Sequence, residues 1–354
     1  MSSSPRLTLV IPCYNEAAII ARNASELVSW MAEHMPETDY ELLLINDGSR
    51  DDTGAILDRL AAGTPNIRAV HHKRNFGRGR AIRTGFENAR GDYVICLDAD
   101  LSYSPEHIPR LLDPLVSGRA DITLASAYHP EGEVVNVPFL RARISRWGNA
   151  FLRWGTYGQL YTVTCVVRGY TRDVVDTLEL ISSGKESHLE VVHKAPLLGF
   201  RLVEVPARLA WRDRKRKGRQ SLLSSLPGFG KGSVFTDHLM YNFVLRPSLL
   251  ALVPIAFCVI ALLLGTVSLF VAFINRFSAL SDGGMFDRLY ISLRETLLGG
   301  QVTLTVMIVA LILLLFFVVL TVIAHINKRN FNELYVLISR MNRRIKALQH
   351  ERDD

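Results

Sequence analysis

Two long stretches without a charged residue constrain this chain more than any other feature. Residues 247–275 (29 residues) and residues 296–327 (32 residues) contain no Asp, Glu, Lys or Arg. A helix needs about 20 apolar residues to cross the hydrocarbon core of a bilayer, so each stretch is long enough to span it. A buried helix of a soluble domain would show a polar face, and neither stretch has one. We therefore expect two transmembrane helices.

The charges that flank these stretches predict their orientation. Residues 208–246 carry nine Lys/Arg against two Asp/Glu, residues 328–354 carry seven against four, and residues 276–295 carry three of each. Because Lys and Arg accumulate on the cytoplasmic side, we expect both flanks in the cytosol and 276–295 in an extracytoplasmic loop. No signal peptide is recognised before the N-terminal domain, so that domain is expected in the cytosol too. The simplest location is the cytoplasmic (inner) membrane of a bacterium.

Charge and cysteine content exclude several classes. Residues 1–207 carry 22 Lys/Arg against 25 Asp/Glu, a net charge of −3, which argues against a nucleic-acid partner. The basic run 212–219 precedes the first apolar stretch by about thirty residues and fits anionic lipid headgroups. The four cysteines, at 13, 96, 165 and 258, have no ligand-like spacing, so we expect neither a zinc site nor a disulfide framework.

The N-terminal half alternates short apolar runs with amphipathic segments. Runs rich in β-branched residues predict buried strands, and segments with 3.6-residue spacing predict helices between them. This alternation predicts an α/β domain with a mostly parallel sheet and right-handed crossovers. The expected strands are residues 7–12, 40–47, 67–72 and 92–100, and the expected helices are residues 16–35, 51–63 and 77–90.

Polar residues close several of the expected strands. Ligands bind at the carboxyl ends of strands in such sheets, which points to Pro12–Glu16, Asn46–Asp47 and Asp98–Asp100. Residues i and i+2 of a strand point the same way, so Asp98 and Asp100 are expected on one side. Two adjacent carboxylates repel unless a cation lies between them, and hard oxygen ligands suit Mg²⁺ or Mn²⁺. A D-x-D sequence alone, however, is more often only a polar strand end.

Four motifs occur in order along this domain. The chain reads V-I-P-C-Y-N-E at 10–16, N-D-G-S at 46–49, N-F-G-R-G at 75–79 and L-D-A-D-L-S-Y-S-P at 97–105. This series resembles the family 2 glycosyltransferases, whose catalytic domain has the GT-A nucleotide-sugar-binding, Rossmann-like fold. With two C-terminal membrane helices, the chain is similar to the polyprenyl-phosphate glycosyltransferases, such as dolichol-phosphate mannose synthases and GtrB-type glucosyltransferases.

The resemblance implies a donor site. It places the nucleotide of a sugar donor against the ends of the first strands and a divalent metal, Mg²⁺ or Mn²⁺, at the D-x-D. Asn46 stands where the family has an aspartate, and Ser102 stands where it has a glutamine. The implied nucleotide-binding residues are Pro12, Tyr14, Glu16, Asn46, Asp47, Gly79 and Ala99. The implied metal ligands are Asp98, Asp100 and Ser102.

The resemblance also implies an acceptor site for a lipid phosphate. Arg141, Ser145 and Arg146 match a basic family motif, although a solvated helix face would look the same. Arg214 is the expected diphosphate contact, with Arg212 and Arg216 as alternatives in register. With Asp98 and Asp100 these residues make up the expected catalytic set. The match is weaker where Ala127 and Thr162 replace an arginine and an aspartate of the family; Arg143 or Arg168 is an alternative source of the missing arginine.

The expected function is metal-dependent, inverting transfer of one sugar from a UDP- or GDP-sugar to a polyprenyl phosphate, undecaprenyl phosphate in a bacterium. The expected parts are a GT-A domain (1–225), a juxtamembrane amphipathic segment (226–246), membrane helices (247–275 and 296–327), a connecting loop (276–295) and a basic amphipathic helix (328–354).

Two other functions share some of these features. A processive polysaccharide synthase has the same N-terminal motifs, but Arg143 rather than a glutamine precedes Arg146-Trp147, and two helices make little channel wall. A non-catalytic nucleotide-sugar-binding scaffold would not need Asp98 and Asp100. Near the C-terminus, an apolar stripe fits either a surface-lying helix or a contact between protomers, and a homo-oligomer is expected. The stripe comprises Leu334, Leu337, Ile338, Met341, Ile345 and Leu348.

Overall fold

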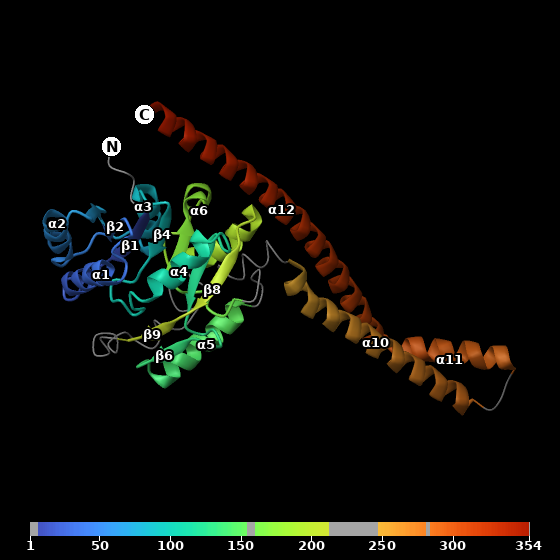
Figure 1. The fold of residues 1–354 in the computed structure, drawn as a ribbon. Helices are drawn as coiled ribbons and strands as arrows, with labels where there is room; N and C mark the ends of the chain where they lie inside the picture. The colour runs from blue at the N-terminus through green and yellow to red at the C-terminus, as the bar shows by residue number, and fades with distance from the viewer. Residues whose placement is uncertain (1–5, 154–159, 212–246, 281–283, 354) are drawn as a thin grey trace. The chain divides into compact units, whose positions relative to one another are not determined.

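The computed structural model describes residues 6–153, 160–211, 247–280 and 284–353. The chain divides into two compact units, Met1–Leu239 together with Asn332–Asp354, and Met240–Phe331 (Figure 1). The expected juxtamembrane segment 226–246 and the basic run 212–219, with Arg214 and its alternatives Arg212 and Arg216, lie outside the described residues.

The first hundred residues alternate strand and helix as predicted. Every expected strand and helix is present in the expected order, which confirms the α/β assignment. The elements are β1 (Leu7–Cys13), α1 (Ile20–His34), β2 (Tyr40–Asn46), α2 (Thr53–Gly63), β3 (Ile67–His71), α3 (Arg78–Asn88) and β4 (Tyr93–Cys96).

The rest of the first unit completes the sheet and adds a smaller one. Its elements are α4 (His107–Val116), β5 (Ile122–Ser126), β6 (Glu133–Val135), α5 (Phe139–Arg153), β7 (Arg168–Thr171), α6 (Arg172–Thr177), α7 (Ser187–Lys194), the 3₁₀ helix η1 (Ala195–Leu198), β8 (Leu202–Pro206) and β9 (Arg208–Ala210). The unit also contains the end of α12 (Gln301–Asp353).

The main sheet has seven strands in the order β3-β2-β1-β4-β7-β5-β8. Strands β1 to β4 pair in parallel, β5 pairs in parallel with β8, and β7 runs antiparallel between β4 and β5. A separate parallel pair joins β6 to β9. Because β1, β2 and β4 are parallel, their carboxyl ends share one edge of the sheet.

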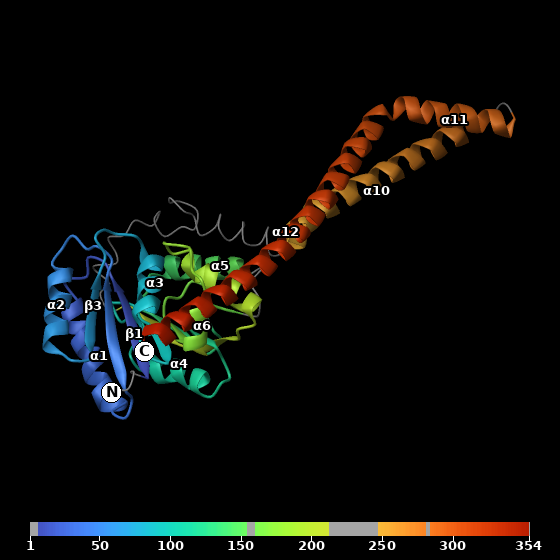
Figure 2. The same cartoon turned by 90° about the horizontal axis from the view of Figure 1, so that it is seen from above.

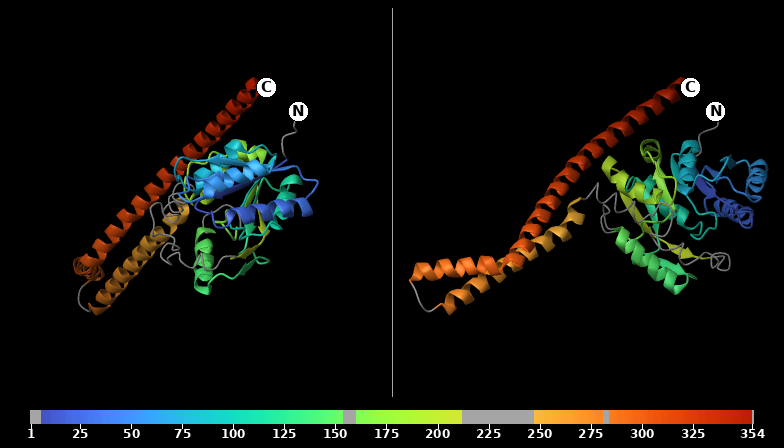
Figure 3. Two further views of the ribbon diagram at one scale, coloured as in Figure 1. Left: turned by 90° about the vertical axis from the view of Figure 1, so that its left-hand side faces the viewer. Right: turned by 180° about the vertical axis from the view of Figure 1, so that it is seen from behind.

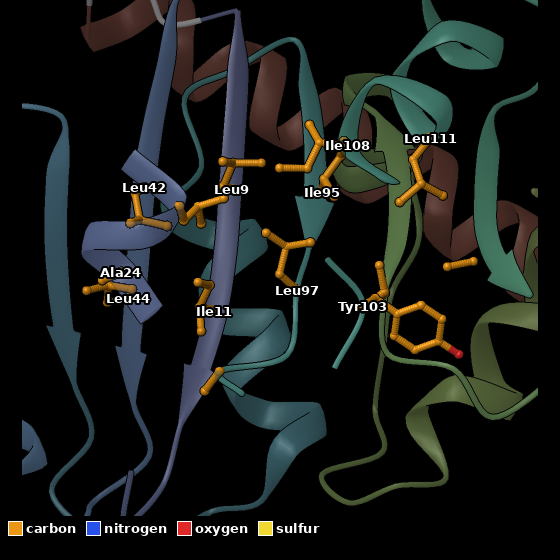
Figure 4. Packing of buried hydrophobic residues seen from close by; sticks show 14 of the residues in the cluster. Leu9, Ile11, Ala24, Leu42, Leu44, Ile95, Leu97, Tyr103, Ile108 and Leu111 are labelled. Carbon is orange, nitrogen blue, oxygen red and sulfur yellow. The ribbon is translucent and has the colours of Figure 1, made fainter. Parts of the chain in front are cut away.

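Helices cover both faces of this sheet (Figure 2). On one face, Leu9, Ile11 and Leu44 pack with apolar residues of α1, α2 and α4 (Figure 4). On the other face, Val10 and Leu43 pack with residues of α3, α6 and α7. Burial on both faces explains why the strand sequences are continuously apolar rather than alternating.

The second unit contains α10 (Pro247–Ala279), α11 (Met285–Gly299) and most of α12. Helix α12 can be followed as one continuous helix in Figure 3. By length and composition, Ala251–Ala279 and Gln301–Ser339 are apolar enough to cross a membrane. The structure differs from the expected connecting loop at 276–295, because residues from Met285 onward form the helix α11. The Gly299-Gly300 pair separates α11 from α12, so the second apolar helix begins later than residue 296.

The close contact between α3 and β1 makes a test of the packing. A methyl group on Gly85 would lie 2.4 Å from Val10 Cγ1, whereas one on Gly63, the last residue of α2, would meet nothing within 4 Å. We expect Gly85→Ala to lower the free energy of unfolding by about 1–3 kcal/mol through overpacking. Gly63→Ala should change it by less than about 0.5 kcal/mol. Thermal unfolding of the two purified variants measures the difference, and equal melting temperatures would contradict this packing.

Candidate active site

The two carboxylates of the D-x-D lie on a turn rather than on a strand. Strand β4 ends at Cys96, and Asp98 and Asp100 follow in a turn closed by the hydrogen bond from Leu101 N to Asp98 O (3.1 Å). The two carboxylates therefore follow the strand instead of ending it, although both line the same pocket. Leu101 has φ of +46°, a left-handed conformation unusual for a residue with a branched side chain.

Contacts from buried side chains fix this turn. Asn23 of α1 is buried and donates from Nδ2 to the carbonyl oxygen of Ala99 (2.8 Å). On the other side, Ser102 donates both its backbone amide (2.9 Å) and its hydroxyl to Asp100 Oδ1. Ser102, an expected metal ligand, is thus placed to orient the Asp100 carboxylate. These bonds hold the turn in one conformation.

The turn opens into a small pocket of about 80 Å³. Five of the predicted site residues converge there from β1, the loop after it and the D-x-D turn, and Arg78 and Val166 join them. Sequence analysis missed Arg78, although it stands between the two glycines of the N-F-G-R-G motif. The lining consists of Pro12, Glu16, Arg78, Asp98, Ala99, Asp100 and Val166.

The loop after β1 is fastened to the turn after β2. Asn15, with φ of +54°, donates from its amide to Ser49 Oγ (3.0 Å) and accepts from the amide of Arg50 (2.9 Å). The amide of Glu16 donates to Thr53 Oγ1 (2.8 Å). Tyr14 is left 40% exposed beside this junction, so its ring is available to a ligand.

Asn46 and Asp47 are buried and bond to neighbouring loops. Asn46 Oδ1 accepts from Ser49 N (3.0 Å), and its Nδ2 lies 3.1 Å from His71 Nδ1. The Asp47 carboxylate accepts from the amides of Phe76 and Gly77 (both 2.9 Å) and lies 2.8 Å from His72 Nδ1. The structure therefore gives both residues a part in shaping the edge of the site.

The glycine loop before α3 packs against the segment before α7. The amide of Gly79 donates to Ser183 O (2.7 Å), and a methyl group on Gly77, which has φ of +97°, would lie 2.4 Å from that oxygen. Glu190 of α7 secures the same segment by accepting from the amides of Ile181 and Ser182 (both 2.8 Å). The amide of Gly79, an expected nucleotide contact, is thus bonded within the protein.

The expected acceptor residues lie on α5. Arg146 is exposed, with its guanidinium 5.8 Å from the centroid of the Tyr128 ring, and Ser145 is half-buried. Arg141 lies in the first turns of the helix, and its side chain is outside the described set. Asn149 ties α5 to the segment that contains Val166, because its Oδ1 accepts from Val163 N (2.9 Å). The helix also exposes Phe139 and Trp147, which gives it an aromatic and basic face.

Arg168 does not replace the missing family arginine. It is fully buried, and it donates to the carbonyl oxygens of His188 (3.0 Å) and Val163. Arg143 is exposed, 5.3 Å from the Phe139 ring. Thr162, at the position of the family aspartate, shares a hydrogen bond with Ser126 Oγ (2.8 Å). These contacts make Arg168 and Thr162 parts of the scaffold.

No thiol beside the pocket is a nucleophile at neutral pH. Burial raises the pKa of Cys96 to about 12, opposed by the Arg168 guanidinium and reinforced by the Asp98 carboxylate. Burial likewise raises the pKa of Cys165 to about 12, again reinforced by Asp98. The pKa of the buried His188 imidazole falls well below its usual value, because burial and the charges of Arg168 and Arg78 disfavour the cation. At neutral pH these two thiols are therefore protonated and the His188 imidazole is neutral.

The donor set of the pocket fits a hard divalent cation. Within the described residues, no group of three or more His, Cys, Asp or Glu side chains is arranged to hold a metal ion. The pocket instead offers oxygen ligands from Asp98 and Asp100, with Glu16 nearby. Mg²⁺ is commonly held by one or two carboxylates together with substrate phosphates, so this arrangement fits a metal that binds with its substrate.

Comparison with known proteins gives the family. The model for "Glycosyl transferase family 2" matches residues 8–178. A polyprenol monophosphomannose synthase from Mycolicibacterium smegmatis is 32% identical over 215 residues, which cover 59% of this chain and 78% of that protein. The chain belongs to glycosyl transferase family 2. The matched region contains β1 to β4, the D-x-D turn and α5.

Two further similarities extend over different lengths. Glycosyltransferase AglD from Haloferax volcanii is 29% identical over 228 residues, and the match covers 63% of this chain but only 36% of AglD. Among solved structures, the mannosyltransferase PcManGT from Pyrobaculum calidifontis, in complex with GDP-Man and Mn²⁺, aligns with 98% of this chain and 88% of its own. Its identity is 15% and its TM-score 0.42. That TM-score is too low to transfer any residue role.

The bond between Asn23 and Ala99 gives a prediction about metal binding. Asn23→Ala leaves the carbonyl oxygen of Ala99 without its buried donor and loosens the turn that carries both carboxylates. Loss of such supporting contacts typically weakens metal binding about 10–100-fold. We expect the variant to need about 10–100-fold more Mn²⁺ than the wild-type protein for half-maximal binding of UDP or GDP. Ser25→Ala, at an exposed position of α1, is the matched control, and identical Mn²⁺ dependence in both variants would refute the role of Asn23.

Proposed function

We propose that this protein transfers one sugar from a nucleotide-sugar to a polyprenyl phosphate, undecaprenyl phosphate if the host is a bacterium. The observation that carries the proposal is the convergence of Glu16, Arg78, Asp98 and Asp100 on one pocket at the carboxyl edge of the sheet. An arrangement of carboxylates with one arginine fits a metal-bound diphosphate, since the carboxylates hold the cation and the arginine faces the phosphate oxygens.

The names of the relatives favour a lipid phosphate as acceptor. The relative from Mycolicibacterium smegmatis is a polyprenol monophosphomannose synthase, and an undecaprenyl-phosphate mannosyltransferase from Micrococcus luteus is similarly matched. The two helices long enough to cross a membrane fit an enzyme whose acceptor resides there. We propose that the first unit lies on the cytosolic side of a bacterial inner membrane, as the flanking charges predict.

On the donor side, the residues of the pocket hold and neutralise the leaving group. Asp98 and Asp100 would hold Mg²⁺ or Mn²⁺, which neutralises charge on the departing nucleoside diphosphate. Arg78 adds a fixed positive charge at the same pocket. The nucleoside is proposed to lie beside the exposed ring of Tyr14, Pro12 and the Asn46–Asp47 turn. Rigid bonding of these loops keeps the charges in position before the reaction begins.

On the acceptor side, orientation matters more than proton removal. A phosphate monoester has a second pKa near 6, so it is mostly dianionic at neutral pH and needs no general base. Its oxygen forms a bond to the anomeric carbon as the bond from that carbon to the diphosphate oxygen breaks, which inverts the configuration. Arg146 and Ser145 of α5, with Arg141 and Arg214, are proposed to bind this phosphate.

The proposal predicts a metal-dependent lipid product. Detergent-purified protein should transfer labelled sugar from one member of a panel of UDP- and GDP-sugars to undecaprenyl phosphate when Mg²⁺ or Mn²⁺ is present. Chelation with EDTA should abolish the product. Asp100→Ala should reduce turnover by at least about 100-fold, because electrostatic stabilisation of the leaving group is lost.

Asp113→Ala is the matched control for this assay. Asp113 is an exposed carboxylate of α4 that pairs only with Arg119 among the contacts described, so its removal should leave turnover unchanged. Metal-dependent nucleotide binding without product from any donor would instead favour a non-catalytic scaffold. Equal activity of the Asp100 and Asp113 variants would contradict the assignment of the site.

A further inference from the structure

Five of the six residues of the apolar stripe at the end of α12 follow heptad spacing, and the sixth, Leu337, lies next to Ile338. Leu334, Ile338, Met341, Ile345 and Leu348 follow one another at intervals of four, three, four and three residues. All five are exposed, with 43–64% of each side chain accessible. Intervals that alternate between three and four residues have a mean of 3.5 residues, which is the spacing of a coiled-coil seam. This spacing keeps the apolar stripe facing one partner helix.

A neighbouring face of the same helix is already occupied within the first unit. Tyr335 and Ser339 are buried, and the Lys194 ammonium of α7 lies 4.9 Å from the centroid of the Tyr335 ring. Lys194 in turn pairs with Glu190. The intramolecular contact therefore uses positions 335 and 339, and the stripe is left for a partner.

The geometry of α12 disfavours a membrane surface as that partner. The helix runs from Gln301 to Asp353 without a glycine or a proline. About 20 residues suffice to cross a bilayer, so much of this 53-residue helix extends beyond it. A segment that left the membrane and then lay flat on it would need a sharp bend, and such bends occur at proline, glycine or a π-bulge.

The residue types in the seam indicate the partner. The intervals place Ile338 and Ile345 at the a positions and Leu334, Met341 and Leu348 at the d positions of the heptad. β-branched residues at a with leucine at d favour parallel two-stranded coiled coils. Two copies anchored in the same membrane present α12 in the same direction, and the shared membrane raises their effective concentration. We propose that the Leu334–Leu348 stripe forms a parallel coiled coil with a second copy of this chain.

The basic residues of this segment are consistent with that geometry. Arg340, Arg343, Arg344 and Lys346 all fall outside the a and d positions. By the same register Arg340, Arg343 and Lys346 fall at c, f and b positions, away from the seam, and only Arg344, at a g position, flanks it. Added salt should therefore change dimer formation little. Attachment of the same residues to anionic lipid would weaken with salt instead.

Single-cysteine crosslinking of the full-length protein in native membranes tests the proposal. The cysteines of the wild-type chain are buried, which makes its background low. Leu334→Cys and Leu348→Cys place thiols at d positions, where equivalent residues of a parallel pair lie close enough for a disulfide. Their adjacent c positions, Glu333→Cys and Ala347→Cys, are matched controls at the same depth on the helix. The c positions point away from the seam.

We expect both d-position variants to form disulfide-linked dimers at least about tenfold faster than their c-position neighbours, in low and in high salt alike. Equal rates within each pair would mean random collision in the membrane and would overturn the proposal. So would d-position thiols that neither crosslink nor react with a water-soluble maleimide, because they would then lie in lipid. Leu334, Leu348 and Glu333 are exposed, so their substitution leaves the fold intact, and the test does not depend on glycosyl transfer.

Discussion

A buried hydrogen bond between α1 and the turn after β4 is the contact on which the site depends. Asp98 and Asp100 lie two residues apart on that turn, and their negative charges repel. The bond from Asn23 to Ala99 O, with those from Ser102 to Asp100, holds the turn in place. Because α1 also packs its apolar face on β1 and β2, the position of both carboxylates is fixed by the core of the domain.

The loops at the same edge of the sheet form a connected set around that turn. Parallel pairing places the ends of β1, β2 and β4 side by side, and backbone-to-side-chain bonds join the loops that follow β1 and β2. Asp47 orders the loop before Arg78, and Glu190 orders the segment against which that loop packs. Arg78 thus faces the carboxylates from a rigid support. Such prior ordering is what electrostatic stabilisation of a leaving diphosphate requires.

Much of this architecture could be predicted from the sequence, because apolar runs and helical spacing are local signals. The strands β1 to β4, the helices between them and the two long apolar helices follow directly from such patterns. The antiparallel insertion of β7 could not be predicted, since a four-residue strand has no distinctive period. The helix α11 could not be predicted from its balanced charges, since charge balance bears on membrane topology and not on secondary structure.

The site residues likewise divide into those that local sequence patterns predict and those whose roles depend on tertiary contacts. Pro12, Glu16, Asp98 and Asp100 were found because they end strands or belong to family motifs, and the structure brings them together. Arg78 and Asn23 were missed because their roles arise from tertiary contacts, between α3 and the pocket and between α1 and the turn. Asn46 and Gly79 were expected to contact the nucleotide, yet their hydrogen bonds are made within the protein. Electron–nuclear double resonance of Mn²⁺ shows directly whether Asp98 and Asp100 hold a metal ion together with a donor diphosphate. With UDP or GDP bound to the full-length protein, Mn²⁺ should show coupling to ³¹P, and Asp98→Ala should abolish it. Protein-bound Mn²⁺ without ³¹P coupling, or a coupling unchanged in Asp98→Ala, would contradict this assignment.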